Sequence, residues 1–150
     1  EIGGKNIMSK VSVVYWSQSG NTQAMAEAVG KGATDAGAEV SVVYVGDASV
    51  DDLKDCKAFA LGCPAMGAEV LEEAEMEPFV ADVESICGGK TVGLFGSYGW
   101  GDGQWMRDWE DRMRGAGATI SGGEGVICQE TPDADAIAAC EALGKALAAV

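Results

Sequence analysis

The sequence predicts an α/β domain whose doubly wound, five-stranded parallel sheet has the strand order 2-1-3-4-5 and helices on both faces. Three observations support this prediction. Short apolar runs alternate with helical patterns along the chain. Short polar or glycine-containing turns separate them, which favours βαβ units and a parallel sheet. The chain has 150 residues and no internal repeat or linker, so a single domain is predicted over residues 8–150. Residues 1–7 precede Met8 without periodicity, and we expect them to be an expression-vector remnant.

The first half of the chain contains three predicted strands. The first is a β-rich run that ends at a Ser/Gly/Asn cluster. In the helix that follows, Met25, Val29 and Ala33 recur every fourth residue, and Gly37 provides a C-terminal stop. The segment after the third strand, 63–76, is predicted to be irregular. The predicted elements are strands at 11–15, 40–45 and 58–62, a helix at 21–36 and a short helical stretch at 50–55.

The second half alternates in the same way. Pro78 is predicted to open a helix that Gly88 and Gly89 end, because proline is favoured at a first helical position. A glycine-rich loop at 99–103 follows the fourth strand, and Gly122–Gly125 divides the fifth strand into two pieces. The predicted elements are helices at 78–87, 104–114 and from 132 onward, and strands at 91–96, 119–121 and 126–128.

The charge is strongly unbalanced, with 24 acidic against 10 basic residues and a net charge of −14. Such a surface repels phosphate backbones, so we expect no nucleic-acid partner. The absence of histidine excludes His-based triads and most zinc sites. No apolar stretch is long enough to span a bilayer and no signal-peptide pattern opens the chain, so we expect no membrane association.

The cysteines do not form a recognisable framework. They number five, are widely spaced and include no Cys-x-x-Cys pair, which fits neither a disulfide scaffold nor a metal cluster. Reduced and mostly buried thiols in a cytoplasmic protein are therefore expected. We also expect neither a metal site nor a catalytic residue set.

Three loops should meet at the carboxyl edge of such a sheet, where doubly wound folds bind ligands. The loop after the first strand, 17–22, offers hydroxyls, an amide, a permissive glycine and free N–H groups at a helix N-terminus. These groups suit a phosphate dianion, although the same residues are also ordinary helix caps. The loop contains no Lys or Arg, and it matches neither a Walker A loop nor Gly-x-Gly-x-x-Gly.

The loops after the third and fourth strands carry Met66 and Trp100, each beside glycine. A soft apolar side chain facing a large aromatic one can sandwich a flat ring whose edges are left to backbone donors. Glycine clusters after strands are often only tight turns. A tryptophan between two glycines, however, is poorly placed for core packing, which favours a binding role. Trp105 and Trp109 are four residues apart on a helix and are expected in the core.

The residues of these three loops resemble the signatures of flavodoxins, most closely the short-chain type of anaerobic bacteria. The resemblance covers the chain from Met8 onward. It is carried by Tyr-Trp-Ser-Gln-Ser-Gly-Asn-Thr at 15–22, Leu-Gly-Cys-Pro-Ala-Met-Gly at 61–67 and Leu-Phe-Gly-Ser-Tyr-Gly-Trp-Gly-Asp-Gly at 94–103. It implies a flavodoxin-like fold and noncovalently bound FMN.

The resemblance also assigns roles to residues. The phosphate would be held by the first loop, the ring would lie between Met66 and Trp100, and Glu69 would accept a hydrogen bond from flavin N3–H. Backbone N–H groups at 99–101 would reach the O2/N1 edge, and Ala65 and Ser97 would line the ribityl path. The implied cofactor-binding residues are Ser17, Gln18, Ser19, Gly20, Asn21, Thr22, Pro64, Ala65, Met66, Gly67, Ala68, Glu69, Ser97, Tyr98, Gly99, Trp100 and Gly101.

Two positions depart from the family pattern. In flavodoxins a peptide at the position of Gly67 turns on reduction, and a type II′ turn with positive φ at Gly67 would suit that geometry. The next residue is Ala68, where relatives often have Asp, Gly or Asn. A type II turn needs positive φ at Ala68, which alanine resists by roughly 1 kcal/mol. Pro64 stands where some relatives have a serine that reaches toward the phosphate.

The implied function is a low-potential one-electron carrier that cycles mainly between semiquinone and hydroquinone FMN. It would be a monomer that meets redox partner proteins through their basic docking patches, and not an enzyme. The alternative is a flavin-dependent NAD(P)H or quinone reductase of similar fold, which would need longer loops or a dimer partner. A phosphoacceptor receiver domain shares the strand order but lacks its acidic residues and its lysine at the corresponding places.

Overall fold

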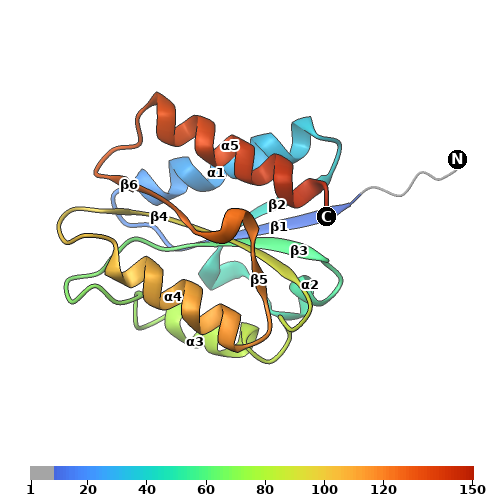
Figure 1. Ribbon diagram of the computed structural model, residues 1–150, viewed down its shortest axis with the longest axis horizontal. Coiled ribbons are helices and arrows are strands. Elements are labelled where there is room, and N and C mark those ends of the chain that lie inside the picture. Colours follow the sequence, from blue (N-terminus) through green and yellow to red (C-terminus); the bar gives the residue numbers. More distant parts are fainter. Residues whose placement is uncertain (1–8) are drawn as a thin grey trace, which may run out of the picture.

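The computed structural model describes residues 9–150, so the expectation for residues 1–7 lies outside the described residues. A sheet runs through the middle, with α1 and α5 on one face and α3 and α4 on the other (Figure 1). The strands are β1 Lys10–Tyr15, β2 Glu39–Tyr44, β3 Ala58–Gly62, β4 Thr91–Tyr98, β5 Thr119–Ile120 and β6 Val126–Gln129. The helices are α1 Asn21–Asp35, α2 Asp51–Lys54, α3 Met76–Val83, α4 Gln104–Gly115 and α5 Ala134–Ala148, with 3-10 turns η1 Val45–Asp47 and η2 Ser121–Gly123.

The sheet order is β2-β1-β3-β4-β5, and every pairing is parallel. The predicted order 2-1-3-4-5 is therefore confirmed. Both β5 and β6 pair with β4, so they share one edge position. The turn η2 separates them, and Gly122 and Gly123 have φ of 74° and 84° there. The prediction of a fifth strand in two pieces is correct.

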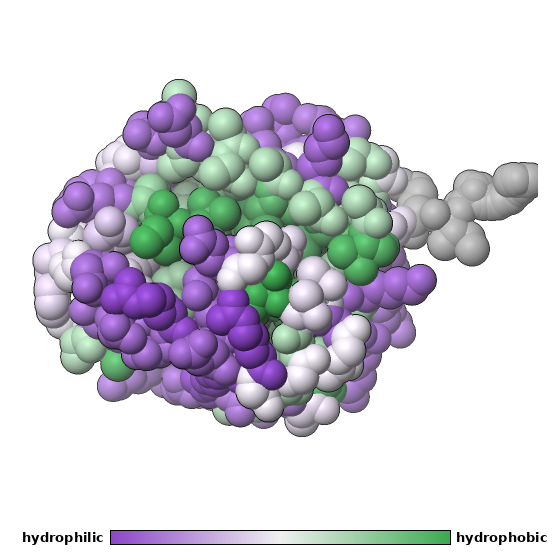
Figure 2. Space-filling view, in the orientation of Figure 1, coloured by the Kyte–Doolittle hydropathy of each residue, from purple (hydrophilic) through white to green (hydrophobic). Residues whose placement is uncertain are grey.

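Each face of the sheet has its own core. On one face, side chains of α3 and α4 pack against β3 and β4, and this cluster includes Trp105 and Trp109, each only 2% exposed. On the other face, α1 and α5 cover Val11, Val13 and Phe95. The two tryptophans are thus core residues, as expected. On the outside of α4, charged side chains of residues 107, 108, 111 and 114 are exposed, and Figure 2 shows hydrophilic residues covering this side.

Several predicted bounds differ from those in the structure, most of all those of α3 and of the end of β4. The helix α3 begins at Met76 and ends at Val83, rather than spanning 78–87, and Pro78 is its third residue. A proline is tolerated there because the first four helical amides have no acceptor within the helix. Strand β4 continues past Gly96 to Tyr98, since β6 pairs with Ser97 and Tyr98. The extra pairing could not be seen in the apolar pattern.

The N-terminus of α3 is capped by Glu72. Its carboxylate accepts hydrogen bonds from the amides of Ala74, Glu75 and Met76 at 2.9, 2.8 and 3.0 Å. Burial acts to raise the pKa of this carboxyl, but these three hydrogen bonds outweigh burial and lower the pKa below its ordinary 4.5. The charged form of Glu72 therefore stabilises the fold.

We expect Glu72→Gln to lower the free energy of unfolding by about 1–2 kcal/mol at neutral pH, because a charged cap is lost. A carboxyl whose pKa is lower in the folded state stabilises the fold when the pH is above its unfolded pKa of about 4.5. This stabilisation is lost as the pH falls through the folded-state pKa. The difference between the two proteins should therefore shrink on acidification. Urea unfolding at several pH values measures it, with Glu73→Gln, at an exposed neighbour, as the control. A difference that persists in acid would contradict the role of charge.

Candidate functional site

Three loops meet around one cavity of about 330 Å³ at the carboxyl edge of the sheet. They follow β1, β3 and β4, the positions at which doubly wound sheets bind ligands. The cavity is lined by Trp16, Ser17, Gln18, Ser19, Asn21, Thr22, Pro64, Ala65, Met66, Gly67, Ser97, Tyr98, Gly99 and Glu130. The lining contains no Lys or Arg, so an anion here would depend on hydrogen bonds alone.

The loop between β1 and α1 presents free donors. Gly20 has a φ of 96°, a left-handed conformation that lets the chain turn sharply into the helix. The hydroxyls of Ser17 and Ser19 accept hydrogen bonds from the amides of Gly20 and Asn21, at 3.2 and 3.4 Å. Within residues 9–150, the amides of residues 22 and 23 donate no hydrogen bond. Together with the helix dipole, these groups form a cradle for an anion.

The hydroxyl of Thr22 ties this loop to the next strand. Thr22 is 1% exposed, and its Oγ1 lies 3.3 Å from Oγ of Ser97, which is 5% exposed. Both side chains line the cavity. Two buried hydroxyls that share one hydrogen bond keep further donor and acceptor capacity, which a polar ligand can use.

The loop after β3 forms a tight turn around Met66. The amide of Glu69 donates to the carbonyl of Met66 at 2.8 Å, and the amide of Met66 donates to the carbonyl of Val70 at 3.0 Å. Among these residues only Glu69 has positive φ, 53°. The turn is therefore not type II′, and the positive φ expected at Gly67 is absent. The second hydrogen bond explains this, because three-residue loops of this kind put the left-handed residue after the turn.

The loop after β4 carries Trp100, whose side chain is 61% exposed. Gly101 and Gly103 flank the path into α4 with φ of 87° and 92°. The carboxylate of Glu69 reaches this loop, and its Oε1 accepts a hydrogen bond from the amide of Gln104 at 3.1 Å. Trp100 follows Gly99, which lines the cavity, and a large aromatic ring left open to solvent offers a flat contact surface for a planar ligand.

Most of the predicted site residues line the cavity, but five do not: Gly20, Ala68, Glu69, Trp100 and Gly101. Gly20 shapes the anion loop through its backbone. The other four belong to the Met66 turn and to the Trp100 loop.

Two lining residues are absent from the predicted contacts. The sequence indicates only packing near the rim for Trp16, and it assigns no role to Glu130. Glu130 has a φ of 58°, and its amide donates to the carbonyl of Tyr98 at 2.8 Å. Both residues directly follow strands, β1 and β6. Ligands of doubly wound sheets bind beyond the carboxyl ends of the strands, so the first residue after every strand is a candidate contact, and this includes Trp16 and Glu130.

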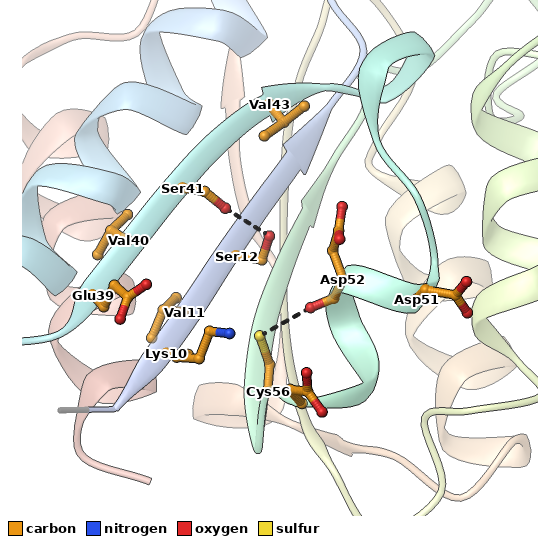
Figure 3. Close-up of a pocket in the computed structure, with 11 residues that line it drawn as sticks. Lys10, Val11, Ser12, Glu39, Val40, Ser41, Val43, Asp51, Asp52 and Cys56 are labelled. Carbon is orange, nitrogen blue, oxygen red and sulfur yellow. Dashed lines mark hydrogen bonds between the residues drawn. The ribbon is translucent and has the colours of Figure 1, made fainter. Parts of the chain in front are cut away.

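A second cavity, of about 390 Å³, lies at the opposite end of β1 and β2 beside α2 (Figure 3). Ser12 and Ser41 share a hydrogen bond of 3.0 Å there, and the thiol of Cys56 donates to the carbonyl of Asp52. The lining includes four acidic residues, Glu39, Asp51, Asp52 and Asp55, and one basic residue, Lys10. Such a lining repels a phosphate, so the cavity at the carboxyl edge is the better candidate for a phosphorylated ligand.

Metal-binding and membrane-spanning features are absent from residues 9–150. No group of His, Cys, Asp or Glu side chains in this range is arranged to hold a metal ion. The same residues include no helix long and apolar enough to cross a membrane. The five thiols are unpaired, and all but that of Cys128 are buried.

Comparisons with known proteins agree on one family. A family model described as flavodoxin matches residues 13–143. The chain is 46% identical to a flavodoxin of Clostridium beijerinckii over 138 residues, covering 92% of this chain and 99% of that protein. It is also 46% identical to a flavodoxin of Megasphaera elsdenii, covering 92% and 98%. The solution structure of the two-electron reduced Megasphaera elsdenii flavodoxin superposes with a TM-score of 0.82 at 45% identity, over 93% of this chain and 99% of that one.

Proposed function

Because this chain belongs to the flavodoxin family, and is thus a low-potential electron carrier that binds FMN, we propose which of its residues hold the cofactor and how it meets its partners. When bound, FMN supplies the chemistry by accepting and releasing electrons one at a time. The protein contributes the pocket, its electrostatics and a surface for encounter. The observation that carries the proposal is the cavity at the carboxyl edge, which is lined by the anion loop, by Met66 and by Gly99, the residue before the exposed Trp100.

The phosphate is held by the loop between β1 and α1. Its donors are the hydroxyls of Ser17, Ser19 and Thr22, the side chain of Asn21, and backbone amides from Gln18 to the start of α1. The unpartnered amides at the N-terminus of α1 support this assignment, because they point a partial positive charge at the cradle. With no basic side chain in the lining, no cation there offsets the negative charge of a reduced flavin, which helps keep the potential low.

The flavin ring lies between Met66 and Trp100. The exposure of Trp100 supports its stacking on the outer face, and the place of Met66 in the cavity lining supports its contact with the inner face. The carboxylate of Glu69 accepts from N3–H, and backbone amides at 99–101 reach the O2/N1 edge. The ribityl chain passes Ala65 and Ser97, while Pro64, Gly67, Ala68 and Tyr98 complete the walls of the site. Glu130 adds a negative charge at the edge of the pocket.

The protein donates electrons to redox partner proteins. We propose that these partners present basic patches, since the chain has a net charge of −14. Opposite charges speed diffusional encounter and allow short-lived complexes, which suits a carrier that must release each partner. The same proposal has the protein acting as a monomer, with the exposed flavin edge near Trp100 as the exit for electrons.

The proposal is tested by titrating the flavin-free protein with FMN and, separately, with riboflavin. FMN should bind one to one and riboflavin much more weakly, because the phosphate cradle contributes only to FMN. Electron transfer to a basic redox protein should slow as salt is added. Equal affinity for FMN and riboflavin would refute the phosphate assignment, and a rate that ignores salt would refute the basic partner.

Replacing Ala68 by Gly is expected to lower the potential of the first one-electron step by up to about 40 mV. Glycine removes a cost of roughly 1 kcal/mol from turns that need positive φ at this position, and such turns would stabilise the oxidised protein. Potentiometric titration measures the shift. Ala74→Gly, at an exposed alanine outside the turn, is the control. An unchanged or raised potential would contradict the prediction.

A further inference from the structure

One carboxylate joins the two loops that flank the proposed flavin. The first residue of α4 is Gln104, and the residue before it, Gly103, has no side chain with which to cap the helix. No acidic residue occupies the first turn either. Instead, Glu69 Oε1 accepts the Gln104 amide at 3.1 Å from a loop 35 positions earlier. The N-terminus of α4 thus takes its acceptor from the Met66 turn.

Hydrogen bonds hold the backbone of Glu69 as well as its side chain. Its amide closes the turn by donating to the carbonyl of Met66, and Met66 in turn donates to Val70. Its φ of 53° is the left-handed conformation, which glycine adopts more readily than glutamate. Strain of this kind persists where the surrounding structure imposes it, often at functional sites. A glutamate in this conformation therefore indicates that its side chain has a role, which glycine could not fill.

The backbone of the Trp100 loop lies close to the Glu69 carboxylate at Gly101. A Cβ at this position would lie 2.7 Å from Cδ and Oε1 of Glu69, so the backbone of the loop packs directly on the carboxylate. Trp100 immediately precedes this contact, and its own side chain is mostly exposed. The position of Trp100 consequently depends on the backbone that Glu69 holds, more than on packing of the indole.

We propose that Glu69 is a positioning residue that ties the Trp100 loop to the Met66 turn before the cofactor arrives. It caps α4 through Oε1 and so places both walls of the flavin site in advance. Its Oε2 accepts no hydrogen bond within residues 9–150 and stays available for a ligand N–H. The tie itself is a property of the flavin-free protein, while its consequence for binding rests on the function proposed above.

Amide hydrogen exchange in the flavin-free protein tests the tie. In Glu69→Ala the protection of the Gln104 amide should fall about tenfold, as expected when a helix cap is lost. Glu69→Gln keeps a carbonyl oxygen at the same place and should restore most of the protection. Glu73→Ala removes an exposed carboxylate from the same segment and should change nothing. Unchanged protection in Glu69→Ala, or equal losses in the Gln and Ala variants, would overturn the proposal.

Stopped-flow binding of FMN tests the consequence. Loss of a pre-placed loop should slow association several-fold in Glu69→Ala, because binding then requires a conformational change. Loss of the N3–H contact alone would instead accelerate dissociation and leave association unchanged, which would overturn the positioning role. A protein that binds no FMN, yet loses Gln104 protection in Glu69→Ala, would refute the proposed function and support the tie.

Discussion

Ser19→Asp is expected to weaken FMN binding at least about 100-fold. The proposed phosphate cradle has only neutral donors, so a new carboxylate would face the dianion with no cation nearby. At an effective dielectric of about 20, two unit charges about 4 Å apart repel by roughly 4 kcal/mol, before solvent screening reduces this value. Isothermal titration with FMN measures the loss.

Two comparisons make this result specific. Ser19→Asn has nearly the same size as the aspartate variant but no charge, and it should retain most of the affinity. Riboflavin, which lacks the phosphate, should bind Ser19→Asp as weakly as it binds the unchanged protein. The aspartate should also leave the fold intact or stabilise it, because Ser19 already caps the amide of Asn21 and aspartate caps helices well. Tight binding of FMN to Ser19→Asp would place the phosphate elsewhere.

Gly144→Ala is expected to cost at least about 3 kcal/mol of folding free energy. In α5, a Cβ on Gly144 would lie far closer than 3.0 Å to the backbone carbonyl of Val29 in α1, and one on Gly32 would meet the carbonyl of Glu141 in the same way. Both partners are backbone atoms, so relief requires the helices to separate. Overpacking that shifts a backbone lies at the costly end of core substitutions.

Gly115→Ala provides the matched control for this prediction. Gly115 is also a helical glycine, at the end of α4, and it has no positive φ. A Cβ added there would have no atom within 4 Å, so alanine should be neutral or stabilising by up to about 1 kcal/mol. Urea unfolding of the two variants gives the comparison. Equal stability of Gly144→Ala and Gly115→Ala would mean that α1 and α5 do not cross as closely as the structure has them.

The sequence predicted the sheet order because the alternation of apolar runs and helical patterns is a local property of the chain. It also named the three loops, since the ends of successive strands in a doubly wound sheet must meet at one edge. It did not predict that β4 extends to Tyr98, because that depends on pairing with β6, about 30 residues later. Glu130 was missed for another reason: it directly follows β6, and the ligand-site rule was not applied to the end of that strand.

The Met66 turn shows a different limit. Gly67 suggested a positive φ at its own position, because glycine permits that conformation. The structure instead puts the left-handed residue at Glu69, where no glycine occurs. Backbone propensity describes which conformations a residue tolerates. The hydrogen bond from the Met66 amide to the Val70 carbonyl selects which of the tolerated turns forms. Similarly, the sequence does not reveal Glu72 as a cap, because it predicts a helix that starts two residues too late.

The sequence by itself determined the architecture, the family and the residue types that the candidate site offers, because these follow from residue types at short spacings. Only the tertiary structure determined which groups far apart in the sequence contact one another. Glu69 meets Gln104, Thr22 meets Ser97, and Gly144 meets Val29 only after the sheet has formed and its helices have packed. Each of these contacts joins segments more than 30 residues apart, and the energy of such a contact depends on geometry that no local pattern of the chain encodes.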